Sequence, residues 1–166
     1  MLNETNQPAV PAKIDLIQQW HAIHNGIEIS FATGPIQIMV LSERLFRIRY
    51  ASGLSFQRDF SYAIADHHPY SGAAFEVHLQ EDVLTLTTSQ LALILKGDKS
   101  IIIKDKQGRI VLEDHEAPAI TEHYENGTTQ LLLQRKIQHG EHFYGLGDKP
   151  GHPDLRNHSY TIWGTD

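Results

Sequence analysis

The segment from His139 to Asp166 gathers the residues of this chain that could do chemistry. Aromatic rings, glycines and charged groups lie close together there, and the chain stops directly after the run Trp163-Gly164-Thr165-Asp166. Such a density is typical of a binding site, whereas a chain end is usually a polar tail or a closing strand. We therefore expect the chain to be the front piece of a larger protein that ends where a binding loop begins.

The glycines of this segment, Gly145 and Gly147, suggest a phosphate-binding loop only superficially. Dinucleotide loops need a third glycine at a fixed offset and must open a helix, whereas residues 148–153 contain two prolines and do not favour a helix start. The two glycines are better explained as permitting a tight bend. We expect side chains near them to fix that bend by pairing or by bonding the backbone: Asp148, Lys149 and Arg156.

Eleven histidines raise the question of a metal site. The densest groups are the pair His139 and His142 and the pair His67 and His68. Zinc needs three or four converging ligands, and two imidazoles share a strand face only at a spacing of two residues. Neither group meets these conditions, so we expect surface histidines, no metal and no cofactor.

Composition excludes several classes of protein. The chain has 166 residues, 20 Asp and Glu against 14 Lys and Arg, and no cysteine. A net charge of −6 without a basic cluster argues against a nucleic-acid partner. The absence of cysteine excludes disulfides and thiolate chemistry. No apolar run has the length of a signal peptide or a membrane span, so we expect a cytoplasmic protein without membrane contact, with export left open.

Alternating apolar and polar residues recur in short runs along most of the chain, and this period of two is typical of β-strands. We expect an all-β antiparallel sandwich with little helix at residues 13–137, after a flexible arm at 1–12 and before a loop or strand segment at 138–166. Two stretches lack the pattern: 113–127 is expected to be a loop, and 51–73 is expected to be a long connection with one short strand at 61–64. The expected strands are 13–23, 27–33, 36–40, 45–50, 61–64, 74–80, 82–88, 90–96, 100–104, 110–112 and 128–137.

Three stretches resemble the N-terminal β-sandwich domain of glycoside hydrolase family 31, the α-glucosidase and α-xylosidase family. They are 38–50, 91–113 and 143–166, the last of which is similar to the family passage Y-G-L-G-[ED]-K … L-R … W-x-T-D. The resemblance implies a galactose-mutarotase-like supersandwich. It also implies that a (β/α)8 barrel, absent from these residues, carries two catalytic aspartates and performs retaining hydrolysis or transfer.

The same resemblance implies roles for the last residues of the chain. Asp166 corresponds to an acid that contacts sugar hydroxyls, which suits a carboxylate because charge-assisted hydrogen bonds are strong. Trp163 could cover the C–H face of a sugar or anchor the loop, and Tyr160 is better explained as an anchor. No catalytic residue is expected within the chain.

The resemblance therefore implies the non-catalytic N-terminal domain of a retaining α-glycosidase, with α-glucosidase as the first candidate, which supports the barrel and contributes a loop to the substrate pocket. The expected partners are the barrel and an α-linked oligosaccharide, and a homo-oligomer is left open. The alternatives are an autonomous carbohydrate-binding module and a protein-interaction sandwich. Intrinsic mutarotase activity rests on fold-level analogy alone, and fold does not fix function.

Overall fold

The computed structural model describes residues 16–51, 53–59, 70–123, 128–145 and 151–160. Within these ranges all regular structure is β-strand, which confirms the all-β prediction. The chain divides into two compact units, Met1–Arg135 and Lys136–Asp166, and each is described by itself.

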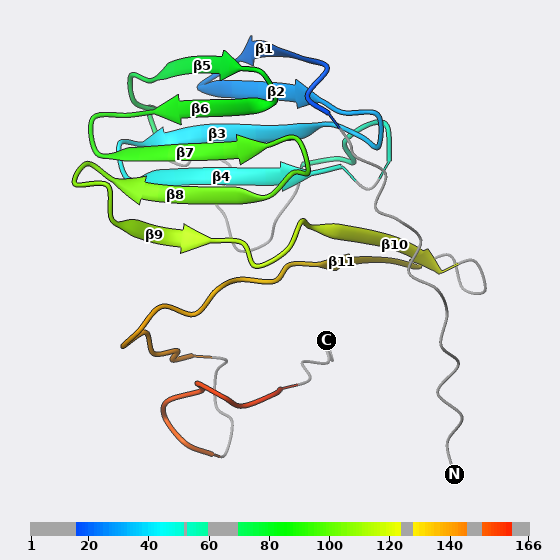
Figure 1. Cartoon of the computed structure of the whole chain (residues 1–166). Helices are drawn as coiled ribbons and strands as arrows, with labels where there is room; N and C mark the ends of the chain where they lie inside the picture. Colours follow the sequence, from blue (N-terminus) through cyan, green and yellow to red (C-terminus); the bar gives the residue numbers. More distant parts are fainter. Residues whose placement is uncertain (1–15, 52, 60–69, 124–127, 146–150, 161–166) are drawn as a thin grey trace. The chain divides into compact units, whose positions relative to one another are not determined.

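A four-stranded antiparallel sheet in the order β1-β2-β3-β4 forms one layer of the first unit (Figure 1). Asn25 has a φ of 52° in the tight turn between β1 and β2. A Cβ atom at Gly26, the first residue of β2, would lie 2.2 Å from the carbonyl oxygen of Ile38, so glycine allows β2 to approach β3. The strands are β1 (Gln19–Ile23), β2 (Gly26–Ser30), β3 (Ile36–Ser42) and β4 (Leu45–Tyr50).

A five-stranded antiparallel sheet in the order β5-β6-β7-β8-β9 forms the second layer. Each strand pairs with the one before it in the chain, so the whole sheet is a meander of hairpins. The strands are β5 (Glu76–Gln80), β6 (Val83–Thr87), β7 (Leu91–Lys96), β8 (Ile101–Asp105) and β9 (Ile110–Glu113).

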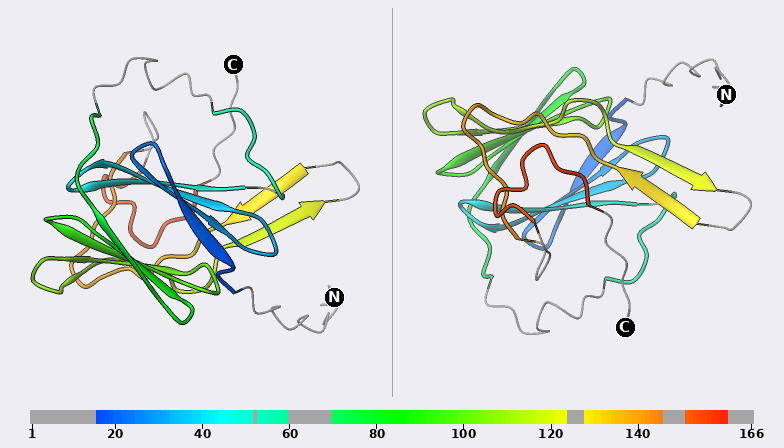
Figure 2. Two further views of the ribbon diagram at one scale, coloured as in Figure 1. Left: turned by 90° about the horizontal axis from the view of Figure 1, so that it is seen from above. Right: turned by 90° about the horizontal axis from the view of Figure 1, so that it is seen from below.

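The two sheets pack face to face, and Figure 2 shows them as separate layers. Every second side chain of β3 and β6 is buried, as the alternating sequence predicts. These side chains meet in one apolar cluster, whose buried members are Ile27, Ile29, Phe31, Ile36, Ile38, Val40, Leu84, Leu86, Leu93, Leu95 and Ile101.

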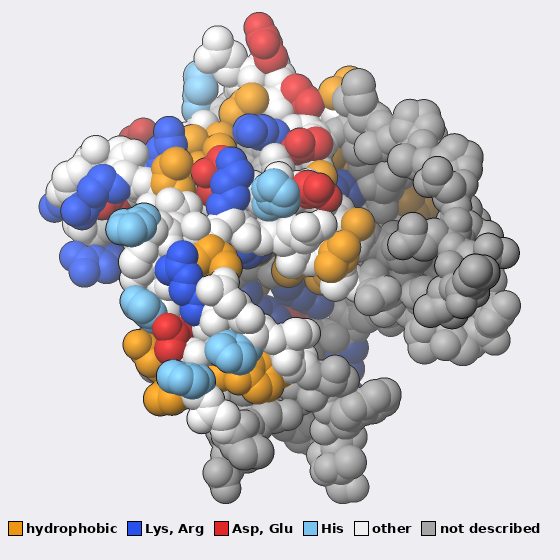
Figure 3. All heavy atoms as spheres, turned by 60° about the horizontal axis from the view of Figure 1, so that its bottom comes forward, with side chains coloured by type: hydrophobic (Ala, Val, Ile, Leu, Met, Phe, Trp, Pro, Cys, Tyr) orange, Lys and Arg blue, Asp and Glu red, His pale blue; other side chains and the backbone are white. Residues whose placement is uncertain are grey.

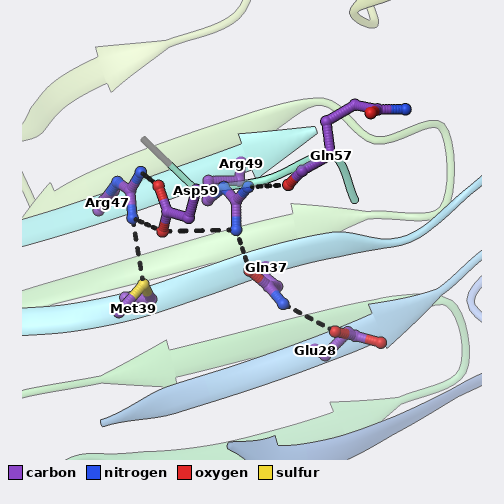
Figure 4. A network of polar contacts seen from close by, with 7 residues as sticks. All are labelled: Glu28, Gln37, Met39, Arg47, Arg49, Gln57 and Asp59. Atoms are coloured by element: carbon purple, nitrogen blue, oxygen red, sulfur yellow. Dashed lines mark hydrogen bonds and ion pairs between the residues drawn. The ribbon is translucent and has the colours of Figure 1, made fainter. Parts of the chain in front are cut away.

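A row of polar contacts crosses the outer face of the four-stranded sheet (Figure 4). Gln37 donates to Glu28 at 2.8 Å and accepts from Arg49 at 3.0 Å. Arg47 binds Asp59 through both terminal nitrogens, at 2.7 and 2.6 Å. Because Asp59 lies in the connection after β4, these contacts hold residues 53–59 on the sheet.

The prediction of a loop over residues 113–127 was wrong at residues 119–123. Strand β10 (Ala119–His123) lies there and pairs with β11 (Thr128–Leu132) as a two-stranded ribbon. Pro118 precedes the strand and so removes no hydrogen bond from it.

The bounds of several other predicted strands also differ from those in the structure, two of them by five residues or more. The strand predicted at 13–23 begins at Gln19, and the one predicted at 128–137 ends at Leu132 and continues only as an isolated bridge between Asp114 and Arg135. The predicted arm at 1–12 and short strand at 61–64 lie outside the described residues.

Candidate functional site

The second unit begins with a tight turn from Gln138 to Glu141. The Glu141 amide donates to the Gln138 carbonyl at 3.2 Å, and the Glu141 carboxylate accepts from the Gln138 amide at 2.8 Å. Gly140 has a φ of 75°, which glycine adopts without strain. The turn therefore closes by local hydrogen bonds.

Asp154 connects the two described segments of this unit, 136–145 and 151–160. One carboxylate oxygen accepts from the backbone amides of Phe143 at 3.2 Å and Arg156 at 3.1 Å. The other lies 2.6 Å from Nδ1 of His142. Three donors thus converge on one carboxylate, two of them from a part of the chain eleven or twelve residues away.

The hydrogen bond from His142, followed by that from the Arg156 amide, lowers the pKa of Asp154 to about 2. Asp154 is therefore an ion at neutral pH and can only accept hydrogen bonds. It follows that Nδ1 of His142 carries a proton in this contact and that Nε2 points elsewhere.

Two further contacts join the same segments. The Leu155 amide donates to the Phe143 carbonyl at 2.7 Å, and Nη1 of Arg156 donates to the Glu141 carbonyl at 2.6 Å. Together with Asp154 they fix the two segments beside each other without a regular strand.

Aromatic rings lie at the surface of this braced unit. Tyr144 is 70% exposed and Phe143 is 40% exposed. The rings of His142 and Tyr144 stack with centroids 6.4 Å apart, and His158 lies between His152 and Tyr160 at 6.3 Å from each. Exposed rings beside polar groups can take the apolar face of a sugar or another protein surface.

Residues 35–166 match the family described as the glycosyl hydrolase 31 N-terminal galactose mutarotase-like domain. The chain belongs to this family. The resemblance stated from the sequence is thereby confirmed.

One relative in sequence is much longer than this chain. Alpha-glucosidase 2 of Bacillus thermoamyloliquefaciens is 27% identical over 179 residues, which cover 100% of this chain and 22% of that protein. The chain therefore spans about a fifth of the length of that relative.

Solved structures of family 31 enzymes share the fold. The dextranase of Flavobacterium johnsoniae has a TM-score of 0.75 at 19% identity, covering 92% of this chain and 19% of its own. The α-xylosidase of Xanthomonas citri has a TM-score of 0.62 at 20% identity, covering 78% of this chain and 15% of its own.

Of the site residues predicted for this family 31 domain, the structure describes Gly145 and Arg156. Gly145 has a φ of 126°, a conformation that a residue with a Cβ rarely adopts, and Arg156 makes the carbonyl contact given above. Their roles in structuring the loop stay predictions. The other predicted site residues lie outside the described residues: Gly147, Asp148, Lys149, Trp163 and Asp166.

Sequence reasoning missed Asp154 and His142 as the centre of this unit. Part of the signal was present, because an aspartate commonly accepts from the amide two residues later, as Asp154 does from Arg156. The contact with His142 spans twelve residues, and no local pattern encodes it.

Two absences hold for the described residues. They contain no group of three or more His, Cys, Asp or Glu side chains that could hold a metal ion. In the same ranges no helix is long and apolar enough to cross a membrane.

Proposed function

We propose that this chain is the non-catalytic N-terminal domain of a retaining α-glycosidase, with an α-glucoside as the first candidate substrate. The observation that carries the proposal is the family match over residues 35–166 in a chain that spans only 22% of its α-glucosidase relative. In that arrangement the catalytic carboxylates belong to a barrel outside these residues, and this domain supports the barrel.

Three carboxylates with shifted pKa values are unsuited to the role of general acid: Asp59, Asp154 and Asp114. A retaining glycosidase needs one carboxyl with a raised pKa as its general acid, about 5–5.5 Å from a second carboxyl. The Arg47 hydrogen bond lowers the pKa of Asp59, and the bond from His142 lowers that of Asp154. Burial raises the pKa of Asp114, but this carboxylate is enclosed beside Arg135, where a substrate does not reach.

We further propose that the end of the chain contributes to the substrate pocket. Asp166 would accept hydrogen bonds from sugar hydroxyls, and Trp163 would cover a sugar face. These residues follow the segment braced by Asp154 within a dozen positions. A braced segment restricts the positions open to the residues that follow it, which lowers the entropy lost when substrate binds.

The test compares the 166-residue chain with the longer protein on an aryl α-glucoside. We expect turnover by the longer protein alone. Asp166→Ala in the longer protein should lower kcat/KM. The loss should correspond to about 1–3 kcal/mol of transition-state stabilisation, which is the range for one lost polar partner. Glu76→Ala, on an exposed position of β5, serves as the matched control. Turnover by the 166-residue chain would refute the division of labour, and an unchanged kcat/KM in Asp166→Ala would refute the substrate contact.

The exposed rings of Tyr144 and Phe143 favour a second candidate, an autonomous carbohydrate-binding module. Titration of the 166-residue chain with maltose and isomaltose distinguishes the two. Millimolar or tighter binding that Tyr144→Ala abolishes would favour the module. Absence of binding leaves the non-catalytic domain as the better explanation.

A further inference from the structure

Two arginines lie next to each other on the outer face of the four-stranded sheet. Arg47 and Arg49 are two positions apart in β4, and alternate side chains of a strand point to the same face. Nη1 and Nη2 of Arg47 lie 2.7 and 2.6 Å from the two carboxylate oxygens of Asp59, and Nη1 of Arg49 lies 3.5 Å from the same carboxylate. Three guanidinium nitrogens therefore surround a single carboxylate, as Figure 4 shows.

The sheet orients both guanidinium groups through neutral partners. Nη1 of Arg49 donates to the side-chain oxygen of Gln37 at 3.0 Å, and the side-chain nitrogen of Gln37 donates to Glu28 at 2.8 Å. Nη1 of Arg47 lies 3.7 Å from the sulfur of Met39. An amide and a thioether hold the arginines in place without neutralising them. Within the described residues, one carboxylate in direct contact therefore serves two positive charges.

Asp59 belongs to a connection that is held on the sheet by the same two arginines. The Gln57 carbonyl accepts from Nη2 of Arg49 at 3.0 Å, and the centre of the Phe56 ring lies 5.0 Å from the guanidinium carbon of Arg49. The Asp59 side chain is 47% exposed. Partly exposed ion pairs are weak, because water and dissolved ions compete for the charges. An anion from solution can therefore compete with Asp59 for the arginines.

The charge of the whole chain does not attract anions. Its net charge is −6, and Figure 3 shows acidic, basic and histidine side chains mixed on the side of the described residues that it brings forward. A broad positive field is therefore a poor explanation for anion binding by this chain. Affinity must come from the local geometry of the guanidinium forks, which match the oxygens of carboxylates and phosphates.

We propose that Arg47 and Arg49 form a binding site for a phosphate group, and that Asp59 occupies this site when no phosphate is bound. The balance of charge favours phosphate over carboxylate, because a phosphate group carries about 1.5–2 negative charges near pH 7 and can serve both guanidinium groups. Phosphate binding then displaces Asp59 and releases residues 53–59 from the sheet. The proposed function assigns no role to either arginine.

Titration of the isotope-labelled 166-residue chain with inorganic phosphate, followed by NMR, tests the site. We expect saturable shifts at the amides of β4 and of residues 53–59. Asp59→Asn should bind phosphate roughly tenfold more tightly, because it removes a tethered competitor. Arg47→Lys keeps the charge but loses the fork, and should bind roughly tenfold more weakly. The amides of β6 and β7, in the other layer, report whether each variant is folded.

A parallel titration with phenyl phosphate separates two sources of the phosphate group. Equal affinity for the two compounds would identify the phosphate group alone as the recognised part. Tighter binding of phenyl phosphate would identify a phosphate monoester as the ligand. Either result supports the site, provided that Asp59→Asn strengthens the binding.

Asp105→Asn is the matched control. Asp105 accepts from Nε and Nη2 of Arg109, each at 2.7 Å, so the substitution frees a single arginine. This variant should bind phosphate at β4 as the unchanged chain does, without a saturable site at Arg109. Sodium chloride at equal ionic strength should leave the β4 amides unshifted.

Several results would overturn the proposal. They are the absence of saturable shifts in both the unchanged chain and Asp59→Asn, equal shifts with sodium chloride, equal affinity in Asp59→Asn and the unchanged chain, and full affinity in Arg47→Lys. Limited proteolysis tests the displacement of residues 53–59 separately. Phosphate should speed cleavage there in the unchanged chain, and slower cleavage would show that Asp59 stays in place.

Discussion

The sandwich and the segment from Lys136 to Tyr160 differ in what stabilises them. In the sandwich, side chains from two sheets enclose one another, and Ile27, Leu84 and Leu93 are each 0% exposed. In the segment, Phe143 and Tyr144 are exposed, and the order comes from polar contacts to Asp154 and Arg156.

This difference predicts how each part should respond to a substitution or to a change of pH. Burial of apolar area is non-directional and does not depend on the protonation of any group. Hydrogen bonds to one partly exposed carboxylate depend on its charge and are local. We therefore expect the sandwich to determine the global free energy of unfolding and the segment to open on its own.

The largest effect is expected from Leu93→Ala in the central strand β7. Removal of a fully buried leucine side chain leaves a cavity and should lower the free energy of unfolding by about 2–5 kcal/mol. Denaturant titration measures this loss. Leu79→Ala on the edge strand β5, where the side chain is 36% exposed, is the control and should cost about 1 kcal/mol or less. Equal losses would mean that the core does not dominate stability.

The next effect is expected from Asp114→Asn, at the junction of the sandwich and the ribbon. The substitution leaves Arg135, whose side chain is 33% exposed, without its ionic partner, and should cost about 1–3 kcal/mol. A double-mutant cycle with Arg135→Gln checks it. The double variant should lose less than the sum of the single losses, and strict additivity would show that the two side chains are not coupled.

A smaller, local effect is expected from Asp154→Asn in the segment. The amides of Phe143 and Arg156 should exchange hydrogen faster, while the denaturation midpoint of the sandwich stays unchanged. His142→Phe is the matched control, because it removes the ring contact and keeps both backbone bonds to Asp154. A shift of the global midpoint in Asp154→Asn would show that the two parts unfold together.

The pH dependence of the same contacts follows from the lowered pKa of Asp154. A carboxyl whose pKa is about 2 when folded and near 4 when unfolded stabilises the segment above pH 4. That stabilisation is lost as pH falls from about 4 to 2. The protection factor of the Phe143 amide, which corrects for the intrinsic pH dependence of exchange, should fall as pH falls through this window, and Asp154→Asn should make it independent of pH there.

The smallest effect is expected from Asp59→Asn on the outer face of the four-stranded sheet. The pairs of Asp59 with Arg47 and Arg49 are partly exposed, so the cost should be about 0.2–1 kcal/mol and should shrink in high salt. Limited proteolysis of residues 53–59 measures the release of this segment. An effect as large as that of Leu93→Ala would contradict the contrast between burial and surface contacts.

The sequence alone determined the sandwich, because its signal is local. In β3, Ile36, Ile38 and Val40 alternate with Gln37 and Met39. This period of two predicts which side chains face the core. The motif at 143–166 likewise allowed the family to be stated before any geometry was known. Where the pattern was weak, as in β10, the prediction failed, because a strand in a two-stranded ribbon does not need a buried face.

Contacts between residues far apart in the sequence could be identified only from the tertiary structure. Lys99 is 8% exposed, with its ammonium group 4.9 Å from the centre of the Phe31 ring and donating to the carbonyl of Gly34, 65 positions earlier. His142 meets Asp154, twelve positions later in the chain, in the same way. Such contacts depend on strand register and on the path of the loops. These are set by the packing of the whole chain, whereas the alternation within a strand is set by the geometry of the extended backbone itself.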